Sequence, residues 1–389
     1  MSLWWAKREQ LDPNQVKLIE DLPLDGNNLV VGPPGSGKTN ILLRRAQYAR
    51  TQGRPNVTVL TFTRPLTEFL RTGCFAGDGR ELFPPSLLNT YESWQREFHR
   101  RNSVALPDVS LGFEERKREL AKSTANILKN NPIPKYDALF VDEAQDLLPE
   151  EIDLILSVSN NVFCVGDEHQ KIYSSTSGLS TLRAKVPSLS EHKLPFHYRL
   201  APEICEVADR IQISSGVGTL SDTQQYQGPR PGRVDVHGPL LRADQIRSAV
   251  ASLKDQIRVY GDLIRDGDKL GVIVPRQSDR EEVLEELEAD PDLAGLAQIV
   301  RARGAEGDNG FNPTIDPAKP ILILSVKGAK GLEFRAAQWL YADDLENVFT
   351  PEVYYTVVTR AKTSLDIYFT SKLPKELAKA YSKTGTSIW

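Results

Sequence analysis

The residues with the clearest chemistry are eight consecutive ones, Gly32-Pro33-Pro34-Gly35-Ser36-Gly37-Lys38-Thr39. They match the phosphate-binding pattern G-x-x-x-x-G-K-[ST] at every fixed position. They follow the apolar run at 29–31 and precede the stretch at 41–45, which is typical of a helix. In such a loop the backbone N–H groups close on phosphate oxygens, the lysine neutralises the β- and γ-phosphates, and the threonine can hold Mg²⁺. The segment therefore predicts a nucleoside triphosphate site formed by Gly32, Pro33, Gly35, Ser36, Gly37, Lys38 and Thr39.

Two adjacent carboxylates, Asp142 and Glu143, directly follow the short apolar run at 138–141. One carboxylate can hold Mg²⁺, directly or through water, and the other can orient or deprotonate an attacking water. Gln170 follows the strand expected at 162–165 and is suited to hydrogen-bond a γ-phosphate. We expect Lys38, Asp142, Glu143 and Gln170 to be catalytic, with Thr39 and Asp142 as the metal ligands.

The elements that must position these residues alternate between strands and helices. Apolar runs predict strands at 57–63, 87–91, 234–236, 270–274, 321–325 and 365–369. Helices are expected from Pro13 after an Asp12 cap, at 202–211, at 281–288 and around Arg360. This order predicts parallel sheets with ligands at their carboxyl edges. We expect one α/β domain over 1–195 and a second over 196–389.

Residues 95–135 interrupt the first domain as a small helical insertion. A charged amphipathic helix is expected at 113–120, before the breaker Asn131-Pro132-Ile133-Pro134. Charge of both signs along such a helix is typical of a solvated face, so we expect no chemistry there. Residues 290–320, rich in Gly, Asp and Pro, are expected to form a surface excursion.

Composition limits the class of protein. The 389 residues are 40% hydrophobic and 26% charged, with a formal net charge of −4, so any contact with nucleic acid must come from a local groove. Three distant cysteines without C-x-x-C suggest neither a zinc site nor a disulfide framework. No apolar stretch is long enough to span a membrane, and the first residues lack the apolar core of a signal peptide. We expect a cytoplasmic protein with no membrane partner.

Taken together, the motifs resemble the superfamily 1 helicases and translocases of the UvrD/Rep type. They occur in the family order over nearly the whole chain. The matching segments are Gln15, the phosphate loop, Thr61-Phe62-Thr63-Arg64, Asn89-Thr90-Tyr91, Val141-Asp142-Glu143-Ala144-Gln145-Asp146, Gly166-Asp167-Glu168-His169-Gln170, Tyr198-Arg199, Lys330-Gly331-Leu332-Glu333-Phe334 and Val358-Thr359-Arg360-Ala361-Lys362.

This resemblance implies two tandem RecA-like P-loop NTPase lobes, each a mainly parallel sheet flanked by helices, with ATP and Mg²⁺ between them. It implies that Gln15 reads adenine and Tyr198 stacks on it, that Arg199 and Arg360 are arginine fingers, and that Gly331 and Glu333 bind nucleotide, with Glu333 on the ribose. Single-stranded DNA would cross both lobes, and RNA is not excluded. The residues implied to contact it are Phe62, Thr63, Arg64, Thr90, Tyr91, Tyr173 and Lys327. For each of these, an ordinary role at a strand end or in the core is equally open.

The sequence departs from the family pattern in three places. The family's base-stacking Trp is missing after Ile172-Tyr173, and Lys327 stands where a histidine is usual. The segments 95–135 and 290–320 are too short to be the two large family insertions. The chain therefore resembles a minimal motor core.

Two functions remain open on this basis. One is ATP-driven, 3′-to-5′ translocation or unwinding on single-stranded DNA. The other is an ATPase subunit that is regulated by nucleic acid or a partner protein and unwinds nothing alone; such a partner would supply the duplex contact. A third class, an ATP-dependent ligase or kinase, would need acceptor-site residues that the sequence does not show.

Overall fold

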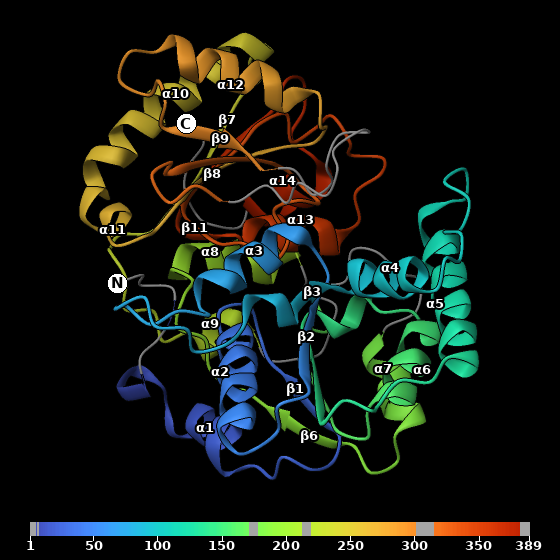
Figure 1. The fold of residues 1–389 in the computed structure, drawn as a ribbon. Helices are drawn as coiled ribbons and strands as arrows, with labels where there is room; N and C mark the ends of the chain where they lie inside the picture. Colours follow the sequence, from blue (N-terminus) through green and yellow to red (C-terminus); the bar gives the residue numbers. More distant parts are fainter. Residues whose placement is uncertain (1–4, 6–7, 171–177, 212–218, 301–314, 382–389) are drawn as a thin grey trace. The chain divides into compact units, whose positions relative to one another are not determined.

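The computed structural model describes residues 5, 8–170, 178–211, 219–300 and 315–381. The described chain divides into two compact units, one of Ala6–Pro195 and one that contains Phe196–Trp389. Each unit is built on a six-stranded, entirely parallel sheet with helices packed against it, so the fold is a tandem pair of RecA-like α/β lobes (Figure 1). Among the described helices, none is long and apolar enough to cross a membrane.

The N-terminal sheet has the strand order β3-β2-β4-β5-β1-β6. Its strands are β1 (Asn28–Val31), β2 (Val57–Thr61), β3 (Leu88–Thr90), β4 (Ala138–Val141), β5 (Val162–Gly166) and β6 (Ser190–Lys193). β1, β2, β4 and β5 are buried along their whole length, as expected for parallel strands covered on both faces. Because all six strands run the same way, the phosphate loop after β1 and the carboxylates after β4 leave the sheet at one edge.

The helices of this unit include α1 (Pro13–Val16), which continues into the short helix η2 (Lys17–Asp21), and α2 (Lys38–Thr51), which follows the phosphate loop. The others are η1 (Arg8–Gln10), α3 (Arg64–Thr72), η3 (Pro85–Leu87), α4 (Tyr91–Arg101), α5 (Phe113–Asn130), η4 (Ala144–Asp146), α6 (Pro149–Val158) and α7 (Gly178–Lys185). One core joins the sheet to α4 through α7, with Trp94, Ile127, Ile152 and Leu179 among its members. The insertion helices α4 and α5 therefore belong to the unit's core.

The C-terminal sheet has the order β7-β12-β11-β8-β10-β9. Its strands are β7 (Arg233–His237), β8 (Leu270–Val274), β9 (Ala297–Ile299), β10 (Ile321–Ser325), β11 (Phe334–Trp339) and β12 (Ala361–Tyr368). Its helices are α8 (Pro202–Ile211), α9 (Leu220–Thr223), α10 (Arg242–Val259), α11 (Gly261–Arg265), α12 (Asp279–Ala289), α13 (Pro351–Val358) and α14 (Lys375–Tyr381). Its core packs Ile246 of α10 and Val283 of α12 against Leu270, Ile321 and Tyr368 of the sheet.

The structure confirms several sequence predictions and corrects two. The strands expected at 270–274 and 321–325 and the helix expected at 202–211 are β8, β10 and α8. The helix expected around Arg360 is wrong, because α13 ends at Val358 and Arg360 lies in the turn before β12. The expectation of a purely solvated helix at 113–120 is also wrong, because Lys117 on α5 forms a largely buried ion pair with Glu151 at 2.9 Å.

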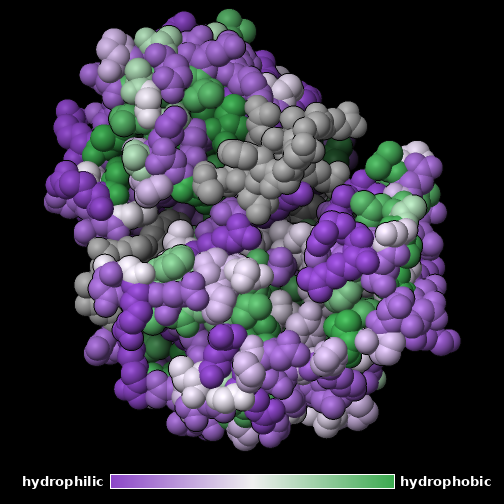
Figure 2. All heavy atoms as spheres, in the orientation of Figure 1, coloured by the Kyte–Doolittle hydropathy of each residue, from purple (hydrophilic) through white to green (hydrophobic). Residues whose placement is uncertain are grey.

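Polar side chains cover most of the face drawn in Figure 2, and hydrophobic ones form separate patches among them. This mixture is ordinary for the surface of a globular protein.

Candidate nucleotide site

The phosphate loop is shaped by glycines that no other residue could replace without strain. Gly35 and Gly37 have φ values of 78° and 85°, the left-handed region that side chains rarely adopt. At Gly32 an added Cβ would come within 2.9 Å of the Leu194 Cβ. Gly37 precedes the first residue of α2, so the loop delivers backbone N–H groups and the positive end of a helix to one place. This arrangement suits an anion.

Lys38 begins α2 and turns its ammonium back onto the loop. Its Nζ donates to the carbonyl oxygens of Gly32 at 2.7 Å and Pro33 at 2.9 Å. Oδ2 of Asp167, after β5, lies 4.0 Å from the same nitrogen. The positive charge therefore lies over the loop at the carboxyl edge of the sheet, where the predicted phosphate site requires it.

Asp142 and Thr39 form an oxygen pair beside the loop. The Thr39 hydroxyl donates to Oδ2 of Asp142 at 2.8 Å, and the Asp142 carboxylate is almost fully buried. Burial, and after it the charge of Glu143, raises the pKa of Asp142 well above its ordinary value. A carboxylate and a hydroxyl at this distance are the donor types that Mg²⁺ prefers, and a cation there would offset the desolvation of the carboxylate. The pair fits the predicted metal ligands.

Glu143 adopts an unusual backbone conformation directly after the strand. Its φ of 54° lies in the left-handed region, a conformation that costs a non-glycine residue about 1–3 kcal/mol and that recurs at functional sites. Its carboxylate accepts a hydrogen bond from the Gln145 amide. The Gln145 Oε1 in turn accepts the Asp167 N–H at 3.1 Å, so Gln145 connects the loops that follow β4 and β5.

Asp167 and Gln145 are site residues for which the sequence alone predicted no role. Asp167 is only 2% exposed, and its Oδ1 accepts the His169 N–H at 2.9 Å. Within the described chain its Oδ2 accepts no hydrogen bond, although it faces Lys38. A buried carboxylate oxygen of this kind points to a ligand or a water at the site. The sequence signal was present, because Asp167 directly follows the apolar run of β5.

Gln170, predicted to contact a γ-phosphate, ends the same loop. It is buried, and its N–H reaches the Asp167 carbonyl at 3.5 Å, which places it at the carboxyl edge of the sheet.

Gln15 contacts the phosphate loop from a separate segment. Asp12 caps α1 by accepting the Asn14 and Gln15 N–H groups, and the Gln15 side chain closes a capping box with the Asp12 N–H at 3.1 Å. The Gln15 Nε2 donates to the Ser36 carbonyl at 3.0 Å. Although a glutamine of this kind is usually a surface residue, Gln15 is only 5% exposed. The helix that was expected to begin at Pro13 is confirmed.

The residues of this unit that were predicted to contact nucleic acid differ in burial and in their contacts. Phe62 is half-buried with the Lys117 ammonium 4.6 Å from its ring centre, and Arg64 is half-buried at the start of α3. Thr63 and Thr90 are buried caps of α3 and α4. Tyr91 lies in the core at 3% exposure, and its hydroxyl donates to the Glu151 carbonyl at 2.8 Å. Stacking of Tyr91 on a base is therefore not compatible with this structure.

Tyr173, also predicted to contact nucleic acid, lies outside the described residues. In the C-terminal unit, Lys327 follows β10 and is exposed, and Tyr198 is half-buried before α8.

Three of the residues predicted in the C-terminal unit, Arg199, Glu333 and Arg360, come together where β11 and β12 begin. Arg199 forms an ion pair with Glu333 and donates to the Thr359 carbonyl at 3.1 Å. Arg360 is 3% exposed and donates to the carbonyls of Thr356 at 2.9 Å and Leu332 at 3.2 Å. Gly331, with a φ of 81°, supplies the turn before Glu333. Arg199, Glu333 and Arg360 thus form one cluster, here called the arginine cluster.

A buried set of charges lies two residues further along β11 and β12. Asp268 is fully buried and accepts hydrogen bonds from Arg335 at 2.7 Å and from Lys362 at 2.7 Å. Arg335 and Lys362 follow Glu333 and Arg360 by two residues, so one carboxylate holds the starts of β11 and β12 together. Burial lowers the pKa of Lys362 to about 8.

Comparisons with known proteins found one matching family and several similar proteins. Residues 15–176 match the AAA domain family. Over 144 residues the chain is 45% identical to F-box DNA helicase 1 of Gallus gallus, a match that covers 34% of this chain and only 14% of that protein. Two solved structures are also similar. A PRRSV helicase has a TM-score of 0.44 at 13% identity, with 92% of this chain and 54% of that chain covered. The Arterivirus nonstructural protein 10 helicase has a TM-score of 0.43 at 16% identity, with 94% and 63% covered.

The family match contains Gln15, the phosphate loop, both carboxylates and Gln170. Over part of its length the chain is thus similar to the AAA domain family and to a DNA helicase.

Proposed function

We propose that the chain hydrolyses ATP to translocate along, or unwind, nucleic acid as a UvrD/Rep-type motor on single-stranded DNA in the 3′-to-5′ direction. The observation that carries this proposal is the placement of Lys38, the Thr39–Asp142 pair and Glu143 around one phosphate loop. The strained backbone of Glu143 and the raised pKa of its buried neighbour are features of a reaction site more than of a structural turn.

In this proposal each residue has one task. Thr39 and Asp142 hold Mg²⁺, which neutralises charge on the transferred phosphoryl group when bound. Lys38 stabilises the β- and γ-phosphates, Glu143 takes the proton of the attacking water, and Gln170 orients the γ-phosphate. Gln15 and Tyr198 hold the adenine, and Glu333 with Gly331 holds the ribose.

Arg199 and Arg360 are proposed as arginine fingers that stabilise transition-state charge. Because they belong to the other unit, hydrolysis would depend on how the two units close, which ties chemistry to movement.

Single-stranded nucleic acid is proposed to contact Phe62, Thr63, Arg64, Thr90, Tyr173 and Lys327. With a net charge of −4, contacts with nucleic acid must be local and mainly to phosphates, so the affinity for nucleic acid should fall steeply with salt.

A cytoplasmic site of action is also proposed, in keeping with three buried free cysteines.

The test compares ATP hydrolysis and unwinding on one preparation of the full chain. ATP hydrolysis is measured with Mg²⁺ alone, with DNA oligomers and with RNA oligomers, and unwinding is measured on duplexes with 3′ or 5′ tails. We expect stimulation by single-stranded DNA and activity restricted to the 3′-tailed duplex. Hydrolysis that no nucleic acid stimulates would contradict the motor.

A second candidate is an ATPase subunit that needs a partner protein for unwinding. It is favoured by the small insertion, which consists of α4 and α5 within the unit's own core, and by the absence of the family's base-stacking Trp. It predicts stimulated hydrolysis with weak unwinding by the lone chain. Unwinding that keeps pace with hydrolysis would exclude this candidate.

A further inference from the structure

Arg45 is a buried cation with an unusual set of partners. It lies on α2, seven residues after Lys38, and is only 2% exposed. Its Nη1 donates to the carbonyls of Leu18 at 2.9 Å and Ile19 at 3.2 Å. Its Nη2 donates to those of Leu22 at 3.1 Å and Pro23 at 2.6 Å. The guanidinium thus binds four carbonyl oxygens where η2 ends.

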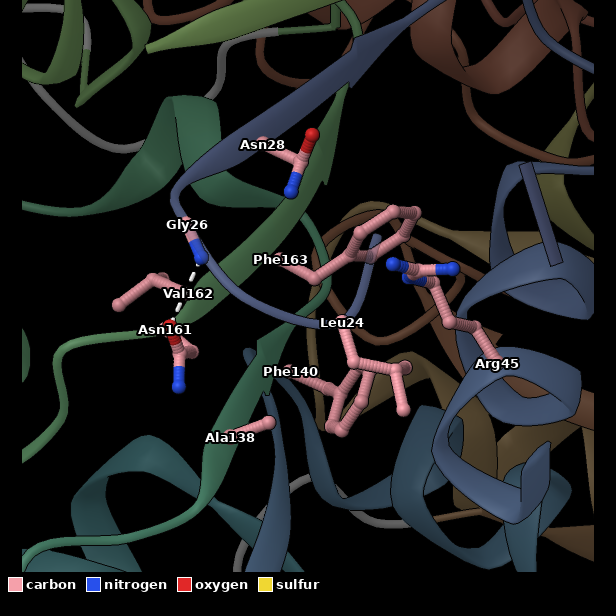
Figure 3. Close-up of a pocket in the computed structure, with 9 residues that line it drawn as sticks. All are labelled: Leu24, Gly26, Asn28, Arg45, Ala138, Phe140, Asn161, Val162 and Phe163. Atoms are coloured by element: carbon pink, nitrogen blue, oxygen red, sulfur yellow. Dashed lines mark hydrogen bonds between the residues drawn. The ribbon is translucent and has the colours of Figure 1, made fainter. Parts of the chain in front are cut away.

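The guanidinium also lies 5.0 Å from the ring centre of Phe163, toward which it points in Figure 3. Within the described chain no carboxylate forms an ion pair with it. Burial lowers the pKa of Arg45 to about 10, so the group remains charged at neutral pH. Carbonyl oxygens at the negative end of a helix, together with an aromatic face, take the place of a counter-ion.

The cavity beside Arg45 is too small to explain this arrangement by a ligand. Leu24, Phe140 and Phe163 are among the residues that line it (Figure 3), and its volume is about 10 Å³. That is about the space that one water needs. The guanidinium therefore acts on the protein itself.

The segment that Arg45 binds is the one that carries Gln15. α1 and η2 have four and five residues, too few to hold their shape without tertiary contacts. The segment is hydrogen-bonded to the phosphate loop and α2 at both ends. At one end Gln15 donates to the Ser36 carbonyl, and at the other Arg45 binds the last carbonyls. One end is thus fixed to the phosphate loop and the other to α2, the helix that begins with Lys38 and Thr39.

We infer that Arg45 is a positioning residue that holds Gln15 where it recognises the nucleobase, and thereby sets the preference of the site for adenine. This inference rests on the proposed function, in which Gln15 contacts the base. Arg45 itself touches no nucleotide, since its hydrogen bonds are all to the backbone of residues 18–23.

The experiment measures kcat and KM for ATP and for GTP in the full chain, with the ratio of the two kcat/KM values as the readout. The variants are Gln15→Ala, Arg45→Lys and the double variant. Arg50→Lys is the matched control, because Arg50 lies on the same helix and binds the single carbonyl of Pro55. Thermal unfolding of each variant reports on the fold.

We expect Gln15→Ala to lower the ATP preference by about tenfold, the loss of one good hydrogen bond. Arg45→Lys, which cannot reach four carbonyls, should lower it by roughly three- to tenfold through a higher KM for ATP, with kcat at saturation unchanged. The double variant should match Gln15→Ala, because the two residues act through one contact. Arg50→Lys should match the wild type.

The outcomes separate the two claims. An unchanged ratio in Gln15→Ala would overturn the base contact in the proposed function. A changed ratio in Gln15→Ala with an unchanged one in Arg45→Lys, or effects that multiply in the double variant, would overturn the inference about Arg45. If Arg45→Lys does not fold, Arg45→Gln, which keeps two N–H donors without the buried charge, is measured in its place and the same ratios decide.

Discussion

The two units place their charged groups at opposite edges of sheets that are otherwise alike. In the N-terminal unit, Lys38, Asp142 and Asp167 come after β1, β4 and β5, at the carboxyl edge. In the C-terminal unit, Glu333 and Arg360 come directly before β11 and β12, at the amino edge. One fold class therefore supports a phosphate site in one copy and an arginine cluster in the other.

The two edges also differ in the partners of their charged groups. Asp167 has a buried oxygen that accepts no hydrogen bond within the described chain, and the pKa of Asp142 is raised by burial. In the arginine cluster, Arg199 donates to Glu333 and to the Thr359 carbonyl, and Arg360 donates to the Thr356 and Leu332 carbonyls. The first edge thus holds buried carboxylates beside a lysine, whereas the second presents arginines that hydrogen-bond within their own unit.

Glu143→Gln should have the largest effect. Without a carboxylate to take the proton of the attacking water, hydrolysis should fall by up to about 10⁴-fold, while ATP still binds because the phosphate loop is intact. Hydrolysis and equilibrium binding of ATP are measured on the same sample, with Glu115→Gln on the exposed face of α5 as control. Near-normal hydrolysis by Glu143→Gln would show that the carboxyl edge is not the reaction site.

Arg199→Ala and Arg360→Ala test the arginine cluster at the amino edge of the C-terminal sheet. Each should lower kcat by roughly 10³-fold with a modest loss of ATP affinity, as expected of arginine fingers. Arg258→Ala, at an exposed arginine of the same unit, is the control for a lost surface charge. Because Arg360 is buried, thermal unfolding must accompany the kinetics. A large loss of affinity at unchanged kcat would instead indicate simple phosphate anchoring.

Asp167→Asn should have a smaller effect on the same reaction. The amide keeps the shape and the hydrogen bond to His169, but it removes the charge 4.0 Å from Lys38. We expect kcat to fall about tenfold, equivalent to about 1.4 kcal/mol of barrier, at unchanged melting temperature. The control is Asp153→Asn, a surface carboxylate paired with Lys185. A kcat equal to the wild type would limit Asp167 to a structural role.

The smallest effect concerns the buried charges below the arginine cluster. The pKa of Lys362 is about 8 in the folded chain, against 10.5 for a lysine that is fully exposed to water. Between these values the unfolded chain binds more protons, so the contribution of Lys362 to stability should rise from pH 8 to pH 10.5 and be flat below. The free energy of unfolding is measured over this range in the wild type and in Lys362→Met. Their difference should grow with pH, and a difference that falls would contradict the assignment.

Much of the carboxyl-edge site could be predicted from the sequence because it is local. The phosphate loop and the pair Asp142-Glu143 each follow an apolar run, and a parallel sheet brings the ends of such runs together. The contacts of Gln145 and Asp167 with this site required the structure, since they join loops that are separated by about 20 residues in the chain.

The amino-edge cluster and some elements were harder to predict. Nothing in the local pattern shows that Arg199 pairs with Glu333, 134 residues away. The polar edge strand β6 has mostly exposed side chains and so carries no apolar signature. Tyr91 was predicted on a nucleic-acid path by resemblance, but an aromatic residue at a strand end serves equally well in the core, where the structure places it. For α10, in contrast, the buried Ile246, Ala249 and Leu253 have a helical spacing, although no helix was predicted there.

We propose that ATP is hydrolysed at the carboxyl edge of the N-terminal sheet. The most direct measurement is steady-state hydrolysis at saturating ATP and Mg²⁺ by the wild type and by Lys38→Ala, each with and without single-stranded DNA. We expect DNA-stimulated turnover in the wild type and none above background in a folded Lys38→Ala. Comparable turnover in both proteins would show that hydrolysis takes place elsewhere in the protein.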